Sequence, residues 1–142
     1  MEKRNATTET ILQDRFGQDC MIALATVEGT IPSVRGVNAF YDAGSFYILT
    51  YALSDKMRQI EKNPQVALSG EWFTAHGLGR SLGWVDSEEN QELARKIRTR
   101  FSGWMNDGHI DFTDRNIVIL QVELSDGILV DGSQRYEIDF RK

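Results

Sequence analysis

The chain has 142 residues, 41% hydrophobic and 26% charged, a composition typical of a folded domain and a length too short for two ordinary ones. Sixteen Lys and Arg against twenty-one Asp and Glu give a net charge of −5, which argues against non-specific binding of nucleic acid. No apolar run approaches the roughly 20 residues that span a bilayer, and the first ten residues lack the apolar core of a signal peptide, so we expect a single domain, residues 1–142, in the cytoplasm.

Cysteine and histidine usage excludes two kinds of chemistry. The one cysteine, Cys20, opens the apolar run 20–25 and leaves no partner for an intramolecular disulfide. His76 and His109 belong to no metal-ligand spacing such as HxxxH, and no GxSxG motif is present. We therefore interpret Cys20 as a small buried side chain and expect no metal site.

The N-terminal part predicts a helix followed by a strand. Residues 8–16 predict a helix with one apolar side, an N-cap at Thr7 and a stop at Gly17. The continuous apolar run of residues 20–27 predicts a strand that is buried on both faces or lies in a barrel wall.

Two further strands and a second helix follow. Residues 33–41 and 45–51 predict strands, and Asp42-Ala43-Gly44 predicts the short hairpin loop between them. Ser54, with an acidic residue directly after it, predicts a helix N-terminus, and Asn63-Pro64 predicts the end of that helix.

Residues 65–73 and 78–85 predict strands in which glycines indicate bends or bulges. The clearest helix covers residues 87–101, because Asp86 and Glu89 have the spacing of a capping box and acidic residues precede basic ones along it.

The last third of the chain predicts mainly strands. Residues 102–114 predict a connection, and residues 135–140 alternate as expected of an edge strand. Between them we expect a strand over 116–124, a turn over 125–127 and a strand over 128–130. Seven or eight short strands with about three α-helices indicate a mainly β protein, a closed or split antiparallel β-barrel with helical decorations.

The residues that carry chemistry lie between positions 35 and 56. The predicted hairpin returns the strand end with Thr50 toward Arg35, and the helix that begins at Ser54 follows directly. Free N–H groups at a helix start, a cap hydroxyl and the cations Arg35 and Lys56 together form a candidate phosphate site. The neighbouring Gly36 would let a flat ring lie against the strand.

Each of these residues also has an ordinary structural explanation. Taken alone, Ser54 is a helix cap, and Lys56 is a solvated helix lysine. Arg35 is then an outward-facing strand arginine, and Thr50 is a common strand residue. The residues alone therefore support two interpretations, a phosphate site or four residues with ordinary structural roles.

An ordered series of motifs spans residues 20–86: an apolar strand, an Arg-led strand, a strand ending in Thr, a Ser-x-Lys helix start, an Asn-Pro helix end and an apolar strand ending in Trp. The segments are Met21 to Val27, Arg35-Gly36-Val37-Asn38, Ile48-Leu49-Thr50, Ser54-Asp55-Lys56, Asn63-Pro64 and Val66 to Trp72. The series resembles the pyridoxamine 5′-phosphate oxidase-like superfamily of FMN-binding split barrels, and it is similar to the general-stress-protein and nitroimidazole-resistance branches of that group.

The resemblance implies a flavin site at a subunit interface. It implies that Arg35, Ser54 and Lys56 hold the phosphate of FMN. It also implies a second set of residues along the flavin, made up of Gly36, Val37, Asn38, Leu49 and Thr50. The family fold further implies a homodimer, in which the partner chain completes each cofactor site.

Some features depart from the oxidase itself. Phe40 stands where the resemblance implies a lysine that touches substrate, and Asp55 replaces an arginine of the phosphate grip. The oxidase's C-terminal substrate segment, which contains an arginine, has no counterpart. We therefore do not expect pyridoxamine phosphate as substrate. Trp72 and Trp84 are candidates for stacking on a flavin, for the core or for a dimer interface.

The leading hypothesis is an FMN-dependent oxidoreductase that passes electrons from a reduced nicotinamide to a small-molecule acceptor. An alternative is a non-catalytic or stress-related protein that binds a flavin, a deazaflavin or haem. A third is a dimeric barrel that has lost its cofactor, to which Asp55 points.

Overall fold

The computed structural model describes residues 1–101 and 110–141. The first elements of this part are β1 (Glu2–Lys3), α1 (Ala6–Phe16), β2 (Cys20–Glu28), β3 (Ile31–Asp42), β4 (Ser45–Tyr51) and α2 (Asp55–Lys62). The remaining ones are β5 (Gln65–Gly70), β6 (Phe73–Trp84), the 3₁₀ turn η1 (Glu88–Asn90), α3 (Gln91–Arg100), β7 (Ile117–Asp131) and β8 (Gln134–Asp139). None of the helices in these two stretches is long and apolar enough to cross a membrane.

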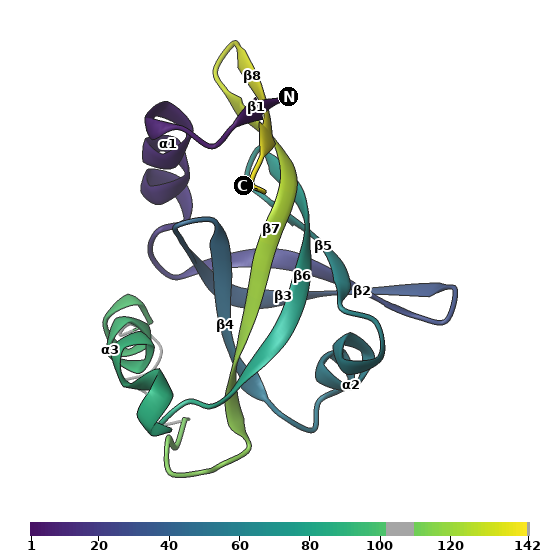
Figure 1. Cartoon of the computed structure of the whole chain (residues 1–142), viewed down its shortest axis with the longest axis vertical. Coiled ribbons are helices and arrows are strands. Elements are labelled where there is room, and N and C mark those ends of the chain that lie inside the picture. The colour runs from purple at the N-terminus through teal and green to yellow at the C-terminus, as the bar shows by residue number, and fades with distance from the viewer. Residues whose placement is uncertain (102–109, 142) are drawn as a thin grey trace.

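Six strands, β2 to β7, close into an antiparallel barrel. The order along the sheet is β1-β8-β7-β4-β3-β2-β5-β6, and the pairing of β6 with β7 closes the ring. The strands β8 and β1 extend the sheet beyond β7, and the three helices lie outside the ring of strands (Figure 1). The predicted fold class, a mainly β split barrel with about three helices, is therefore confirmed for the described residues.

The barrel interior is filled by side chains that alternate along the strands, and α1 and α2 add to it. Phe16 of α1 contacts the rings of Phe46 and Phe73, with centroids 5.7 Å away in both cases. Met57 and Ile60 of α2 are buried in the same cluster. Burial of these apolar groups is the main force that holds both helices against the barrel.

A second, smaller core lies outside the barrel wall, under α3. Ala94, Ile97 and the residue after the helix, Phe101, are fully buried there against Phe40 and Ile119 of the wall. The helix α3 thus covers one side of the barrel, and α2 packs at the barrel's end against β2 and β6, with its apolar residues in the main core. Outward-facing side chains of β2 and β6, such as Met21 and Leu78, stay exposed.

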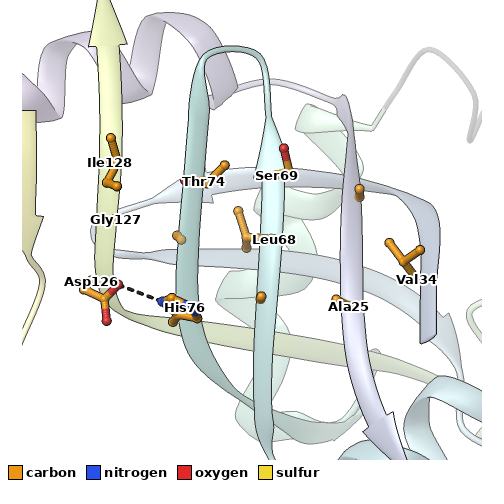
Figure 2. Close-up of a pocket in the computed structure, with 12 residues that line it drawn as sticks. Ala25, Val34, Leu68, Ser69, Thr74, His76, Asp126, Gly127 and Ile128 are labelled. Carbon is orange, nitrogen blue, oxygen red and sulfur yellow. Dashed lines mark hydrogen bonds and ion pairs between the residues drawn. The ribbon is translucent and has the colours of Figure 1, made fainter. Parts of the chain in front are cut away.

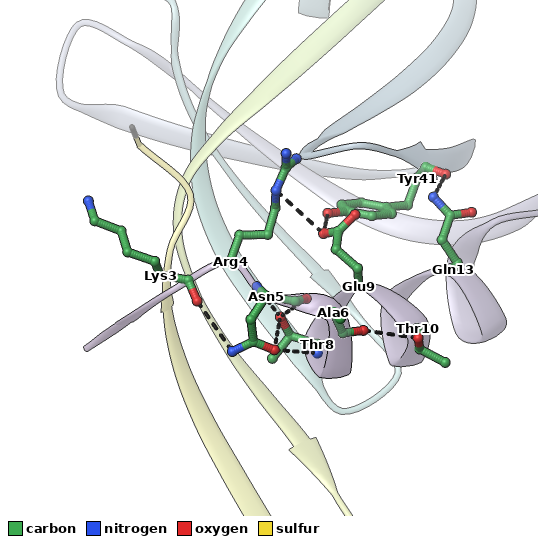
Figure 3. Close-up of polar contacts among 9 residues, drawn as sticks. All are labelled: Lys3, Arg4, Asn5, Ala6, Thr8, Glu9, Thr10, Gln13 and Tyr41. Atoms are coloured by element: carbon green, nitrogen blue, oxygen red, sulfur yellow. Dashed lines mark hydrogen bonds and ion pairs between the residues drawn. The ribbon is translucent and has the colours of Figure 1, made fainter.

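The N-terminus of α1 is fixed by a capping box at Asn5 rather than by the predicted cap, Thr7. The Asn5 side-chain oxygen accepts a hydrogen bond from the backbone N–H of Thr8 at 3.0 Å, and the Thr8 hydroxyl accepts one from the Asn5 backbone at 3.2 Å (Figure 3). The helix therefore begins two residues earlier than expected, because the asparagine satisfies the free N–H groups of its first turn. Its predicted stop, Gly17, is the C-cap residue.

Two predicted strand interruptions are absent from the described strands. Residues 73–84 form the single strand β6, which begins after a turn at residues 71–72. Residues 117–131 form the single strand β7, although a turn was predicted at 125–127. A Cβ on Gly127 would lie 2.9 Å from the ring of Phe73, too close for a side chain, so the glycine here permits close packing and does not form a turn.

The predicted helix over residues 87–101 begins differently from the expectation. Residues 88–90 form a 3₁₀ turn, α3 itself begins at Gln91, and no capping hydrogen bond comes from Asp86. Asp86 instead pairs with Arg98 at 3.7 Å. Of the predicted connection over 102–114, residues 102–109 lie outside the described part of the chain.

Candidate phosphate-binding site

Two cations and the start of α2 come together at one end of the barrel. Arg35 lies on β3 with its side chain turned toward α2, where its Nη2 donates to the Gln59 side-chain oxygen at 3.2 Å. Lys56 lies in the first turn of the same helix, after the N-cap Ser54. The chain thus brings three of the predicted phosphate ligands, Arg35, Ser54 and Lys56, to α2. The alternative explanation, in which Arg35 is an outward-facing strand arginine, does not agree with this direction of its side chain.

Arg35 is held by a network of hydrogen bonds. Its Nη1 donates to the Thr26 hydroxyl at 2.9 Å and to the carbonyl of Leu24 at 3.2 Å. The Thr26 hydroxyl in turn donates to the Gln59 side-chain oxygen. Burial lowers the pKa of the Arg35 guanidinium, and the charge of Asp55 offsets part of that effect.

Lys56 carries a charge that the surrounding protein does not neutralise. Burial, and after it the charge of Arg35, lowers the pKa of the Lys56 ammonium. Among the residues that the structure describes, none forms an ion pair or hydrogen bond with this ammonium. Two half-buried cations that oppose each other are a favourable environment for an anion.

Ser54 supplies a buried hydroxyl without a hydrogen-bonding partner. Its side-chain oxygen is inaccessible to solvent and has no partner among the described residues. It also makes no cap hydrogen bond to the helix that it precedes, so the usual role of an N-cap serine is not fulfilled. An orphaned buried hydroxyl beside free helix N–H groups is suited to a ligand oxygen.

Asp55, which replaces an expected arginine, does not point into this site. Its side chain is 87% exposed and lies 3.7 Å from Arg58. Arg58 also forms an ion pair with Glu28, and the hydrogen bond and charge of Arg58 lower the pKa of the Glu28 carboxyl. The negative charge of Asp55 is therefore shared with a neighbouring cation at the surface and does not block the site.

The three residues that follow Arg35 divide between the two faces of β3. Gly36 is exposed on the outer face, where a Cβ would meet only the side chain of Met21. Val37 is buried in the barrel core, so only its backbone is available to a ligand. Asn38 is half-buried and donates to Asp19 at 3.0 Å.

Leu49 and Thr50 lie farther from Arg35 than the hairpin predicted. The pairing of β3 with β4 runs only from Asp42–Ser45 to Phe40–Tyr47, and beyond that point the two strands separate. Thr50 pairs with Val118 of β7 instead. The side chain of Leu49 packs against the smaller core under α3. Of the two residues, Thr50 lies nearer the start of α2.

A shallow hollow of about 300 Å³ lies on the exposed outer face of β2, β5 and β6. Small side chains form its floor, among them Ala23, which pairs with Gly36, and Ala25. His76 and Asp126, joined at 2.8 Å between Nδ1 and Oδ1, stand at its edge (Figure 2). The hollow therefore lies beside the exposed strand surface at Gly36 and extends across β2, β5, β6 and β7.

The two tryptophans that the sequence analysis proposed as candidates, Trp72 and Trp84, have different environments. The Trp84 indole donates to the Phe112 carbonyl at 2.8 Å, and the ring packs against the smaller core. Trp72 is 69% exposed and has a positive φ of 54° in the turn between β5 and β6. A large side chain held exposed in a left-handed conformation is typical of a contact site, so Trp72 is the tryptophan available to a ligand or a partner.

Cys20 is half-buried, and its thiol donates to the Ala39 carbonyl at 3.2 Å. Burial, together with the charge of Asp19, raises the thiol pKa to about 11. A thiol with a raised pKa is a poor nucleophile at neutral pH, in agreement with the interpretation of Cys20 as a structural side chain.

Two residues that the sequence did not single out belong to the site, Thr26 and Gln59. Thr26 follows Ile22 and Leu24 at inward-facing positions of β2, so a polar residue in that alternation was the available signal. Gln59 lies three positions after Lys56 and therefore on the same side of α2. Neither signal identifies Arg35 as the partner, because α2 packs against β2 and its contact with Arg35 of β3 appears only in three dimensions.

The comparisons with known proteins agree on the fold. The family model described as pyridoxamine 5′-phosphate oxidase matches residues 11–128. No curated protein matches this chain in sequence.

Three similar solved structures illustrate the range of relatives. General stress protein 26 from Bacillus anthracis is 17% identical with a TM-score of 0.68, over 92% of this chain and 98% of that one. A NimC/NimA family protein from Clostridium acetobutylicum is 21% identical with a TM-score of 0.64, over 92% and 93%. An FAD-binding protein from Mesorhizobium loti is 13% identical with a TM-score of 0.66, over 87% and 92%. At these identities the likeness concerns the fold.

Proposed function

Because the chain belongs to the pyridoxamine 5′-phosphate oxidase family, we propose that it binds FMN and uses the flavin to transfer electrons to or from a small molecule. The observation that supports this most directly is the orphaned hydroxyl of Ser54 beside two cations, Arg35 and Lys56, of which Lys56 has no counterion among the described residues. A phosphate monoester carries about −1.5 to −2 charges at neutral pH, which matches the two positive charges.

The residues at the start of α2 fit the phosphate of FMN. Arg35 donates from its guanidinium, Lys56 contributes its ammonium, and Ser54 contributes both its hydroxyl and its place before the free N–H groups of α2. The outer face of β3 would hold the flavin ring, because Gly36 presents backbone there without a side chain and Asn38 presents an amide. Thr50 would lie on the phosphate side of the flavin. Val37 would contribute its backbone to the flavin site, and Leu49 would contribute apolar packing.

When bound, a flavin supplies the two-electron redox chemistry, and the protein supplies binding and orientation. Because the flavin would carry the redox chemistry, no acid–base pair of side chains is required for it. A reduced nicotinamide is the proposed electron donor, and a small organic molecule is the acceptor. The FAD-binding protein from Mesorhizobium loti supports a flavin ligand by its likeness in fold.

Pyridoxamine phosphate is not the proposed substrate. Phe40, which replaces the lysine expected to touch that substrate, is fully buried and stacks on Tyr47 with ring centroids 5.5 Å apart. The position is therefore part of the core under α3 and presents nothing to a substrate.

A second copy of the chain is proposed to complete the site. Apolar side chains stand exposed on the outer face of β2, β3, β6 and β7: Met21, Val34, Leu78 and Ile128. Exposed apolar groups gathered on one face are typical of an interface. Because Gly36 lies on the same face, a partner seated there would lie against the bound flavin.

The visible absorption spectrum of the purified protein tests this function. We expect a flavin spectrum that NADH or NADPH bleaches. A flavin spectrum without bleaching would favour a non-catalytic flavin carrier, and a Soret band would favour haem. A colourless protein that stays colourless after titration with FMN would contradict the proposal.

The phosphate assignment has its own test. The double variant Arg35→Ala with Lys56→Ala removes both cations, and we expect the affinity for FMN to fall by about a hundredfold or more, from the loss of two charged hydrogen bonds. Arg95→Ala with Glu92→Ala on α3, a double variant away from the site, serves as the control and should bind FMN as the wild type does. Unchanged affinity in the Arg35 and Lys56 variant would show that the phosphate binds elsewhere.

A further inference from the structure

We infer that Thr26 and Gln59 are positioning residues that hold the Arg35 guanidinium so that one of its edges, Nε with Nη2, remains available to a phosphate. The inference rests on the proposed phosphate site and adds how that site selects its ligand. Its basis is the hydrogen-bond pattern around Arg35 and the burial of both partners, which are 0% and 6% exposed respectively.

The hydrogen bonds occupy one part of the guanidinium and leave another. Arg35 has five N–H groups in a planar fork. Both N–H groups of Nη1 are used, by Thr26 and by the carbonyl of Leu24, and Nη2 uses one on Gln59. The Nε–H and the second N–H of Nη2 remain, and no described residue accepts from Nε.

The two remaining N–H groups lie side by side on one edge and point in the same direction. Such an edge matches two oxygens of a phosphate in a bidentate contact, which is stronger and more directional than contact with a single donor. The Thr26–Gln59 pair occupies the edge formed by Nη1 and Nη2, so the guanidinium cannot rotate without breaking hydrogen bonds. Its orientation is thus set before a ligand arrives, which lowers the entropic cost of binding.

The chemistry of Gln59 suits this role because the amide is neutral. Its oxygen accepts from both Thr26 and Arg35, so the oxygen of the amide faces these two residues. A carboxylate at this place would hold the guanidinium equally well but would neutralise the charge that the phosphate needs.

The test compares FMN with riboflavin, which lacks the phosphate, in the full chain freed of bound flavin. Both dissociation constants are measured by flavin fluorescence. The dissociation constant of riboflavin divided by that of FMN reports the contribution of the phosphate alone. We expect Gln59→Glu and Thr26→Val each to reduce this ratio by about tenfold. Affinity for riboflavin should stay within about twofold, and Thr26→Ser, which keeps the hydroxyl, should retain the wild-type ratio.

Matched variants and the range of outcomes make the test decisive. Gln134→Glu on β8 adds the same charge on an exposed strand and should leave the ratio unchanged. Equal losses of affinity for FMN and riboflavin, or an unchanged ratio in Thr26→Val, would overturn the positioning role while leaving the flavin site intact, because Gln59→Glu changes the charge beside Arg35 and Thr26→Val removes only a hydrogen bond. A wild-type protein that binds neither flavin would overturn the proposed function, and this inference with it.

Discussion

The start of α2 brings Arg35 and Lys56 close enough for each to disfavour the other's charge. Burial and the nearby guanidinium lower the pKa of Lys56, so the folded protein holds this ammonium at a cost in free energy. Proteins retain such unfavourable charges mainly at functional sites, where a ligand relieves them. The unfavourable pair is therefore an argument for an anion site that does not depend on the family.

The stability of Lys56→Met tests this reasoning. Methionine keeps the length of the side chain and removes its charge, so we expect the melting temperature of the flavin-free protein to rise by about 1–3 °C. The gain belongs to pH values at which the lysine is charged. A folded-state pKa below the unfolded one makes the charged form unfavourable at neutral pH, and the gain shrinks as the pH rises toward the ordinary lysine value of 10.5.

Thermal melts followed by circular dichroism between pH 7 and about 10.5 provide the measurement. The same variant should bind FMN about tenfold more weakly, because a charged donor to the phosphate is lost. A lower melting temperature together with unchanged FMN affinity would assign Lys56 an ordinary structural role.

Asp55 permits a prediction in the opposite direction. Its carboxylate is highly exposed, yet its charge acts on Arg35. Replacing it in Asp55→Asn should strengthen FMN binding by about two- to threefold at low salt, and the difference should fade as the salt concentration rises, because exposed charges are screened. Titration of FMN at two ionic strengths measures this.

Glu88→Gln, in the 3₁₀ turn before α3, removes an exposed acidic charge away from the site and is the control. If Asp55→Asn and Glu88→Gln change the affinity equally, the effect comes from net charge alone. In that case Asp55, which stands in place of the expected arginine, has no specific effect on the phosphate site.

At this scale the sequence predicted part of the site. The motifs predicted that Arg35 would lie near the helix that carries Ser54 and Lys56, and the structure has Arg35 on β3 in contact with α2. Ser54 and Lys56 are placed by local signals, a helix cap and a first helical turn. Thr50 could not be placed in the same way, because the separation of β3 from β4 after Phe40–Tyr47 depends on the curvature of the closed barrel. Local pairing rules contain no information about that curvature.

Among the elements, α1 offers a direct comparison of prediction and structure. The sequence favoured Thr7 as N-cap, whereas the structure has Asn5 with a reciprocal hydrogen bond to Thr8. We expect Asn5→Ala to destabilise the protein by about 1 kcal/mol, because the first turn loses its cap. Thr7→Ala, the neighbouring exposed position, is the matched control and should change the stability little.

Denaturation by urea, with unfolding followed by circular dichroism, measures both variants. The effect on global stability arises because Leu12 and Phe16 of α1 are buried in the main core, so loss of the cap loosens the helix that carries them. Equal destabilisation by the two variants would show that the cap at Asn5 has no special importance.

Long strands were harder to predict than helix ends. Of the predicted turn residues, Asp126 pairs with His76 of β6 and Gly127 with Ala75, and only Ser125 lies at a shift of register, between His76 and Gly77. Pairing on both sides outweighs the local preference for a turn, and Gly127 is needed where Phe73 approaches. Such tertiary effects on strand length are not visible in a local pattern.

The whole molecule is covered unevenly. The helix α3 packs on one outer face of the barrel, and the opposite face presents Val34 at 68% exposure, with Trp72 in the turn between β5 and β6. A hollow of about 300 Å³ floored by small side chains lies in the same face (Figure 2). The proposed homodimer would remove these apolar groups from water and place a second chain beside Gly36.

A charge at the centre of this face tests the dimer. Val34→Glu replaces an exposed side chain, so we expect the fold to persist with a melting curve close to that of the wild type. In the dimer the same carboxylate would be buried without a partner, and we expect the variant to sediment as a monomer at micromolar concentration where the wild type sediments as a dimer.

Thr10→Glu, on the exposed side of α1, adds the same charge away from this face and should leave the dimer intact. FMN affinity should fall with Val34→Glu but not with Thr10→Glu, because the partner chain completes the site. A wild-type monomer would contradict the proposed dimer, and a dimeric Val34→Glu variant would place its interface on another face.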